Sequence, residues 1–446
     1  MNEHYTPVQL NRLYEQFFER GLKYFFPFAT IEPIGSDAGA HDGAGDADKS
    51  LASLTWLGSR YALHNDMSFT EHDVRMVESV SAVLTIRYQM LRDADRNGFD
   101  IERFAGLPED RYVSAFLDRR GYSEGAQSGP DRIADAIEVL RTSALTTYEN
   151  RRISTGALLF GRSPDPCHEL PEAPPHSIPY SSALTRARSF HRLSDGLNTV
   201  ALVDQQGLFV DVIDVQRWSE PYSTLPFPVP SPTRYEAHCR ATLCGGHICL
   251  ILTSTGEMKI FADGVQVFRF LDGRWRITDA LDRYHLWQQS LSNAKLADKL
   301  FVTALNLVED RRGGLLVVLD DPRAASHLMS QSDLLSSTPI QQPVPGHASK
   351  DQFHYLLRDK SVLDLPTTVL ETIARIDGAL ILDADADLLA FGAILHYPDL
   401  VDLHPGNIEG GRSSAAIAAS RFGSALKISE DGLISFYQNG KHIWDM

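Results

Sequence analysis

A carboxylate at the expected start of a strand is the first residue in this chain whose type and place suggest chemistry. Asp377 is followed by Gly378 and Ala379 and then by the apolar run LILDAD, which predicts a β-strand. A side chain at a strand start can face a cleft, and a glycine beside it lets a ligand approach the backbone. A carboxylate in that place can hold a divalent metal and an attacking hydroxyl. We expect Asp377 to be both catalytic and a metal ligand.

A glycine-led helix start further along the chain is the second candidate. Free N–H groups in the first turn of a helix and the positive end of its dipole attract anions. An arginine and two hydroxyl groups add donors that suit a triphosphate. No Walker A motif occurs. With Gly378 and Ala379, the residues predicted to bind nucleotide here are Gly410, Gly411, Arg412, Ser413 and Ser414.

These two segments, in this order, resemble the diadenylate cyclase domain. Members of that family have an Asp-Gly-Ala motif opening a strand and, later, a Gly-Thr-Arg-His-Arg-Ala-Ala-like motif opening a helix. The resemblance covers residues 300–446, including the strand GGLLVVLD and the terminal hairpin ISEDGLISFYQNG. It implies condensation of two ATP molecules to cyclic di-AMP and pyrophosphate, with Mg²⁺ or Mn²⁺ as cofactor.

One departure from the family pattern concerns the phosphate-binding motif. Ser413 and Ser414 stand where members of the family have a histidine and a second arginine. Loss of a bidentate phosphate clamp costs a few kcal/mol of transition-state stabilisation. Two alternatives to an active cyclase therefore stay open. One is a catalytically inactive module that senses a nucleotide or a cyclic dinucleotide, and the other is a structural scaffold.

The pattern of strands and motifs occurs twice. Upstream, Asp195 and Gly196 precede a predicted hairpin, and Arg240 lies at a helix start where the second arginine of the motif would fall. We expect these three residues to bind nucleotide as well. Because diadenylate cyclases work with two domains face to face, the duplicated chain predicts an intramolecular pseudo-dimer or a homo-oligomer whose halves supply complementary parts.

The elements that position these residues indicate a mixed α/β (α+β) fold with central mixed β-sheets flanked by helices. Residues 1–150 look mostly helical and predict an N-terminal sensory region, either plainly helical or GAF-like. In that region Thr70 can cap a helix that has Asp73 three residues on. Residues 151–281 predict a degenerate cyclase-like unit, and 282–446 predict the cyclase-like domain, which opens with a helical pattern over 282–310.

Composition narrows the classes of partner. Lys and Arg total 42 against 58 Asp and Glu, so the formal net charge is −16. An acidic chain repels a phosphate backbone, so we expect ATP as ligand and no nucleic acid. No apolar stretch approaches the roughly 20 residues that span a bilayer, and four cysteines do not form a disulfide framework. We expect no membrane partner and a reducing, cytoplasmic location.

Two metal-like patterns have a simpler structural interpretation. Cys239, Cys244, His247 and Cys249 have the residue types of a zinc site, but the paired CxxC spacing is missing and Cys packs as a small apolar residue in a strand. Asp383, Asp385 and Asp387 resemble the start of a calcium loop without its glycine and glutamate. We expect the first group to lie partly in a strand and the second at a hairpin tip.

Overall fold

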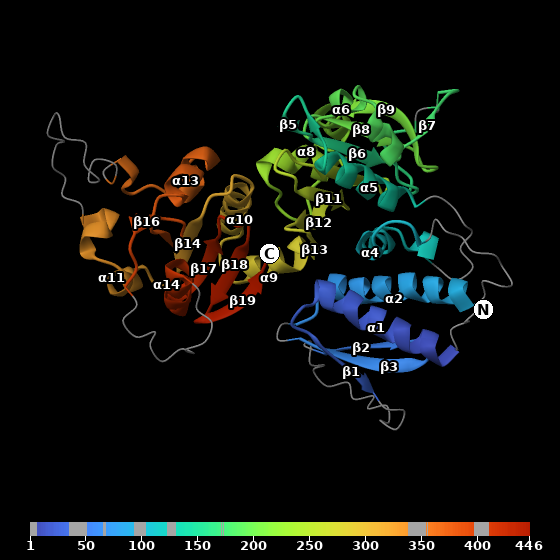
Figure 1. Ribbon diagram of the computed structural model, residues 1–446. Helices are drawn as coiled ribbons and strands as arrows, with labels where there is room; N and C mark the ends of the chain where they lie inside the picture. The colour runs from blue at the N-terminus through green and yellow to red at the C-terminus, as the bar shows by residue number, and fades with distance from the viewer. Residues whose placement is uncertain are drawn as a thin grey trace. The chain divides into compact units, whose positions relative to one another are not determined.

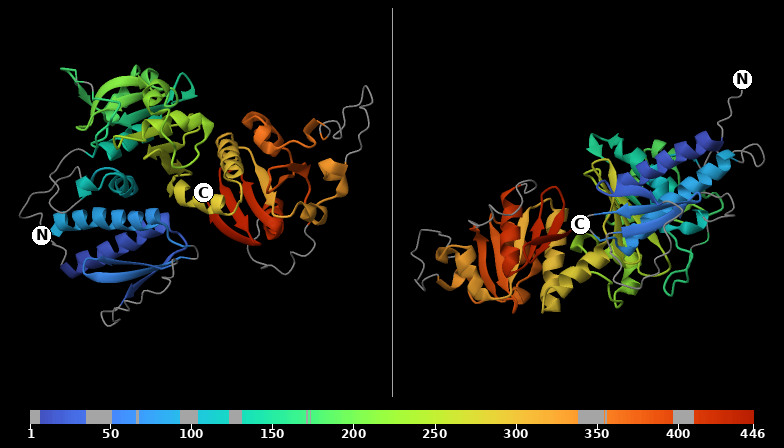
Figure 2. Two further views of the ribbon diagram at one scale, coloured as in Figure 1. Left: turned by 180° about the vertical axis from the view of Figure 1, so that it is seen from behind. Right: turned by 90° about the horizontal axis from the view of Figure 1, so that it is seen from below.

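The computed structural model describes residues 7–34, 51–65, 68–92, 104–122, 131–170, 172, 174–337, 354, 356–396 and 410–446. The chain divides into two compact units. Unit 1 comprises Met1–Phe227 and Ala237–Asp279, and unit 2 comprises Pro228–Glu236 and Ala280–Met446. Figure 1 and Figure 2 show the elements of each unit. Helices flank mixed sheets in both units, which confirms the predicted α/β class.

The amino-terminal part of unit 1 combines two helices with a three-stranded antiparallel sheet of order β1-β3-β2. Phe18 stacks on Trp56 with ring centroids 4.5 Å apart, and Trp56 Nε1 donates to Thr85 Oγ1 at 3.0 Å. The mostly helical interpretation missed this sheet because β1 and β2 bury few side chains and carry little apolar alternation. The elements are α1 (Pro7–Phe25), β1 (Thr30–Ile34), β2 (Leu51–Trp56), β3 (Ser59–His64) and α2 (Glu71–Arg92).

The helix predicted after Thr70 is confirmed, and its cap is reciprocal. The backbone N–H of Asp73 donates to Thr70 Oγ1 at 3.1 Å, and the backbone N–H of Thr70 donates to Asp73 Oδ2 at 3.0 Å. This capping box satisfies two N–H groups that a helix start would otherwise leave without a partner. The cap therefore fixes the start of α2 at a position that the local sequence predicts.

The remainder of unit 1 is an eight-stranded mixed sheet of order β13-β12-β11-β10-β6-β8-β9-β7. Only β6 and β8 run parallel to each other. Its strands are β6 (Thr155–Leu159), β7 (Ile178–Pro179), β8 (Thr199–Val203), β9 (Leu208–Asp214), β10 (Ile248–Leu252), β11 (Met258–Ala262), β12 (Val265–Leu271) and β13 (Arg274–Ile277). The other elements are α4 (Pro108–Leu117), α5 (Arg132–Ala144), α6 (Phe190–Leu193), α7 (Val215–Ser219), α8 (Glu236–Ala241) and the ribbon of β4 (Thr147–Tyr148) and β5 (Arg151–Arg152).

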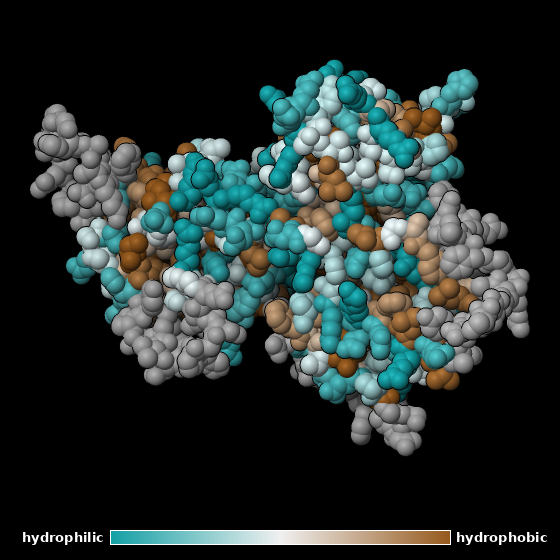
Figure 3. Space-filling model, in the orientation of Figure 1, coloured by the Kyte–Doolittle hydropathy of each residue, from teal (hydrophilic) through white to brown (hydrophobic). Residues whose placement is uncertain are grey.

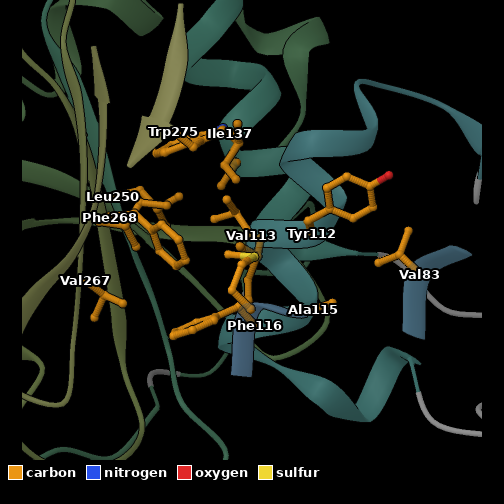
Figure 4. Packing of buried hydrophobic residues seen from close by; sticks show 14 of the residues in the cluster. Val83, Tyr112, Val113, Ala115, Phe116, Ile137, Leu250, Val267, Phe268 and Trp275 are labelled. Carbon is orange, nitrogen blue, oxygen red and sulfur yellow. The ribbon is translucent and has the colours of Figure 1, made fainter. Parts of the chain in front are cut away.

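One hydrophobic core joins the two parts of unit 1. Phe116 of α4 lies edge-on against Phe268 of β12 with ring centroids 4.9 Å apart, as Figure 4 shows. Nearby, the buried Asp110 accepts from Arg141 Nη2 at 2.6 Å and from Trp275 Nε1 at 2.7 Å. A buried carboxylate with both partners present is satisfied, whereas losing one partner would leave a buried charge. Residues 1–150 therefore share a core with the sheet that follows them.

Unit 2 is a six-stranded mixed sheet of order β16-β15-β14-β17-β18-β19 between helices. Gly314 faces Ala374 of α13 and Leu307 of α10, whereas its neighbour Gly313 faces Arg412 of α14, so the helices cover opposite faces. The strands are β14 (Gly314–Leu319), β15 (Ala379–Asp383), β16 (Leu388–Ala393), β17 (Gly423–Ile428), β18 (Ile434–Gln438) and β19 (Lys441–Asp445). The helices are α9 (Ala280–Gln289), α10 (Ala294–Glu309), α11 (Ala325–Leu328), α13 (Thr367–Ala374) and α14 (Gly411–Ala419).

The helical pattern expected over 282–310 forms two helices. α9 ends at Gln289, and α10 begins after Asn293, whose side chain accepts from the backbone N–H of Leu296 at 3.2 Å. Asn is a strong N-cap residue, so it starts a new helix within a segment whose apolar spacing looks continuous. The predicted helical pattern is therefore confirmed, and the Asn293 cap divides it into two helices.

The two sheets repeat one topology. Six strands of unit 1, in the order β9-β8-β6-β10-β11-β12, match the whole sheet of unit 2, including the single parallel pair. The hairpin turns also match. The N–H of Thr253 donates to the carbonyl of Glu257 at 2.8 Å, and the N–H of Ser429 donates to the carbonyl of Leu433 at 2.8 Å. The internal repeat predicted from the sequence is thus present as a repeated strand order.

The surface is mixed in polarity. In the view of Figure 3, hydrophobic residues lie in separate small groups among hydrophilic ones. Large apolar side chains with high exposure include Phe28 at 85% and Leu145 at 90%. Among the described residues, none of the helices combines the length and the apolar character needed to cross a lipid bilayer.

We expect Phe116→Ala to lower the free energy of unfolding of unit 1 by about 3–5 kcal/mol, because it opens a cavity in the shared core. Urea denaturation of the full chain, followed by hydrogen exchange in α2 and in β10, measures this loss. Both segments should lose protection together. Phe28→Ala is the control, since that ring is 85% exposed. Loss of protection in α2 alone would contradict a shared core.

Candidate functional site

The segment that carries Asp377 is fixed by the backbone around it. Asp377 follows α13 and precedes β15, and Gly378 between them has a φ of +111°. A Cβ atom on Gly378 would overlap the backbone of Gly392 and Ala393 in β16. Glycine is therefore required here by the close approach of two chains as well as by the positive φ. The Asp377 side chain points outward and is 96% exposed.

Arg412 reaches Asp377 from the first turn of α14. Arg412 Nη2 donates to Asp377 Oδ1 at 3.3 Å, although the two residues are 35 positions apart. Arg412 Nη1 lies 3.8 Å from Glu430 Oε1, at the turn between β17 and β18. The guanidinium passes over Gly313, where a Cβ atom would collide with it. The structure thus brings together the carboxylate and the helix start that the sequence singles out.

The two serines in the first turn of α14 are not equivalent. Gly410 has a φ of +93° and no side chain to cap the helix. Ser414 is half-buried, whereas Ser413 is buried and its Oγ accepts from Lys427 Nζ at 2.9 Å. Of the two serine hydroxyls predicted to bind phosphate, that of Ser414 is the more accessible.

The remaining predicted residues of unit 2 contribute backbone. Ala379 is 1% exposed and packs in the core between the sheet and α14. Gly411 is exposed at the first position of α14. The prediction that Ala379 binds nucleotide is therefore not supported, because its side chain serves the core. Gly411 can offer an N–H group to a ligand, and Arg412 and Asp377 offer the charged groups.

In unit 1 the corresponding residues serve the fold. The carboxylate of Asp195 accepts from the backbone N–H groups of Leu197, Asn198 and Thr199 and from Asn198 Nδ2, at 2.7–3.0 Å. Burial raises the pKa of Asp195, but these hydrogen bonds outweigh it and leave the pKa below its usual value. Gly196 has a φ of +73° and lies against the backbone of Thr155. Asp195 and Gly196 thus close a loop.

Arg240 is also occupied by structural contacts. Arg240 Nη1 donates to the carbonyl oxygens of Tyr222 and Ser223 at 3.2 Å, and its guanidinium stacks over Phe227 at 4.3 Å. Its neighbour His238 is fully buried and bonds through Nε2 to the carbonyl of Gly196 at 3.0 Å. Burial lowers the pKa of His238 to about 4, so the ring is neutral at pH 7. The unit 1 positions therefore hold loops together.

The residues of the two metal-like patterns contribute hydrogen bonds and packing to the fold. His247 Nδ1 accepts from the N–H of Gly161 at 2.8 Å, and Nε2 bonds to Asp165 Oδ2 at 2.6 Å, which uses both ring nitrogens. Cys249 lies fully buried in β10. Asp383 accepts from the backbone N–H groups of Asp385 and Asp387 in the turn between β15 and β16. The described residues contain no group of three or more His, Cys, Asp or Glu placed to hold a metal.

Sequence reasoning missed Glu430, Gly313 and Lys427. Glu430 lies in a polar hairpin turn, where acidic residues are common, so its type carries no signal. Gly313 precedes a strand and looks like an ordinary loop residue. Lys427 stands between the apolar residues Leu426 and Ile428 of its strand, and that charge in an apolar segment was the one available signal.

No family model matches this chain, and no curated protein matches it. Among solved structures, one described as the hypothetical membrane spanning protein from Bacillus cereus is similar over 36% of this chain and 69% of that chain. The sequence identity is 20% and the TM-score is 0.26.

We expect Asp195→Ala to lower the free energy of unfolding by about 1–2 kcal/mol, since it removes the acceptor for three backbone N–H groups at a solvent-screened site. Asp377→Ala is the matched control and should leave stability unchanged. Urea denaturation measures both. Equal losses for the two variants would contradict the separate roles.

The titration of Asp195 predicts that the free energy of unfolding depends on pH. The folded-state pKa of Asp195 is lowered, so its stabilisation is fully present above the unfolded-state pKa of about 4 and is lost as pH falls through the folded-state pKa. The difference in unfolding free energy between wild type and Asp195→Asn should therefore shrink below about pH 4. Denaturation midpoints from pH 7 to pH 2 test this. A constant difference would contradict it.

Proposed function

We propose that unit 2 is a diadenylate cyclase that condenses two ATP molecules to cyclic di-AMP and pyrophosphate. Its triphosphate site is the first turn of α14 together with Arg412, and Asp377 is its catalytic carboxylate. The observation that carries the proposal is the contact of Arg412 with Asp377, which unites the two motifs of the resemblance in one place.

The charges around Arg412 suit an exchange of partners. The guanidinium lies between two carboxylates, with Asp377 Oδ1 at 3.3 Å and Glu430 Oε1 at 3.8 Å. All three side chains are more than a third exposed, so these ion pairs are weak. A triphosphate offers bidentate oxygens and a larger negative charge. Arg412 can therefore turn to the phosphates and release the carboxylates for other work.

The carboxylates fit a metal of the Mg²⁺ class. Such an ion takes one or two protein carboxylates and completes its shell with phosphate oxygens and water, so a dedicated cluster of protein ligands is not needed. Asp377 would hold it, with Glu430 as a second ligand. When bound, Mg²⁺ or Mn²⁺ neutralises charge on the phosphates. In this proposal Asp377 also accepts the proton of an attacking ribose hydroxyl.

An exposed apolar residue precedes Asp377 in the sequence. Ile376 is 43% exposed, and it would offer contact area to a purine while the triphosphate binds at α14.

The reaction needs a second nucleotide, because the 3′-hydroxyl of each ATP attacks the α-phosphorus of the other, and two molecules of pyrophosphate leave. Asp195 and Arg240 of unit 1 already bind backbone groups. A second copy of the chain, facing the first as a homo-oligomer, is therefore a better source of the second ATP than an intramolecular pseudo-dimer.

We also propose that the protein acts in the cytoplasm. Its four cysteines are free, and no disulfide joins them.

The alternative is a catalytically inactive module that senses a nucleotide or a cyclic dinucleotide. The serines at 413 and 414 favour it, because they supply no positive charge where the family motif has two cations. Such a module would keep Arg412 and the α14 turn for binding, and it would release no pyrophosphate.

We expect the purified chain with ATP and Mn²⁺ to form cyclic di-AMP, and we expect Asp377→Ala to abolish the product while leaving the protein folded. Mass spectrometry of the product measures this. Asp195→Ala, compared at a temperature where both variants are folded, should retain product because Asp195 serves a loop. Loss in both variants would instead support a site that uses both halves.

Binding separates the remaining alternatives. Measurable affinity for ATP without formation of cyclic di-AMP would favour the sensing module over the cyclase. If the chain neither forms cyclic di-AMP nor binds ATP, the structural scaffold is the interpretation that remains. Arg412→Ala should weaken ATP binding by about tenfold or more, since it removes a charge-assisted pair of hydrogen bonds.

A further inference from the structure

A lysine of β17 lies beneath the first turn of α14. Lys427 Nζ donates to Ser413 Oγ at 2.9 Å, and Ser413 is one residue from Arg412. Ser413 is 8% exposed, so this contact lies between the helix and the sheet. A cation therefore occupies the space under the helix start, although the sequence at 413 and 414 has none.

Lys427 belongs to a polar row across three strands. In the register of the sheet, Lys427 pairs with Ser435 of β18, and Ser435 pairs with Asp445 of β19. His442 Nε2 bonds to Asp445 Oδ1 at 2.9 Å. Burial raises the pKa of Asp445, but hydrogen bonds from His442 and Ser435 and the charge of Lys427 outweigh it, and the pKa is lowered. The row therefore holds a carboxylate that balances the lysine.

Unit 1 shows that the fold does not require a lysine at this place. The matching hairpin turns align Ser429 with Thr253, and the residue two positions before each turn is Lys427 in unit 2 and Ile251 in unit 1. Ile251 pairs with Lys259, as Lys427 pairs with Ser435. Lys259 is buried and lies 3.3 Å from Glu257 within the sheet.

We propose that Lys427 is a positioning residue for nucleotide binding: it holds the first turn of α14 through Ser413 and places beneath it the positive charge that Ser413 and Ser414 do not supply. This inference rests on the proposed function. A positive charge in a partly buried place is screened less than one in water, so it adds to the field of the helix N-terminus. The phosphates bind to the turn, and Lys427 acts through it.

The test is a titration of the full chain with a fluorescent ATP analogue and Mg²⁺. Lys427→Met keeps the length of the side chain and removes its charge, and it should weaken binding about tenfold. Lys427→Arg keeps the charge and should stay within about threefold of wild type. Lys441→Met is the matched control, since Lys441 is an exposed lysine of β19, and it should bind like wild type.

Two readouts separate positioning from general stability. Binding to Lys427→Met should depend less on salt than binding to wild type, and Lys427→Arg should restore affinity; a purely structural role would move neither. Wild-type affinity in Lys427→Met would overturn the inference, as would equal weakening in a folded Lys427→Arg. If Lys427→Met does not fold, Ser413→Ala should weaken binding about threefold by removing the tether, and unchanged affinity would overturn the inference. Failure of wild type to bind the analogue would overturn the proposed function as well.

Discussion

The contact between Arg412 and Asp377 is the interaction on which the account of unit 2 depends. It joins the start of α14 to the start of β15 across 35 residues of sequence. Two glycines make it possible, because Gly313 leaves space for the guanidinium and Gly378 allows the chain to turn against β16. The pair is exposed and therefore contributes little to stability. An ion pair of this kind is ready to be replaced when a more strongly charged ligand arrives.

The two repeats have the same topology, but the residues at their matching motifs make different contacts. Both sheets have the same strand order and similar hairpin turns. In unit 1, Asp195 is saturated by the backbone of its own loop and Arg240 by carbonyl oxygens. In unit 2, the carboxylate of Asp377 faces solvent and meets only an exposed arginine among the hydrogen bonds described for it. The proposed function therefore rests on the side chains that unit 2 places on this topology and not on the topology itself.

Much of the fold was predictable because its signals are local. The cap formed by Thr70 and Asp73, the apolar strands and the repeat all follow from short-range patterns. The sheet near Trp56 was missed, since strands that bury few residues lack a clear alternation. The convergence of Asp377 and Arg412 was expected from two motifs in order. The contacts of Glu430 and Lys427 were not, because they depend on strand register and on space left by a distant glycine.

The most direct test of the central claim is a crystal structure of the full chain with a non-hydrolysable ATP analogue and Mn²⁺. The account predicts phosphate density against the backbone of Gly410 and Gly411, with the Arg412 guanidinium turned from Asp377 toward the phosphates. Density for the metal should lie between the phosphates and Asp377. An analogue bound elsewhere, with Arg412 still on Asp377, would contradict the account.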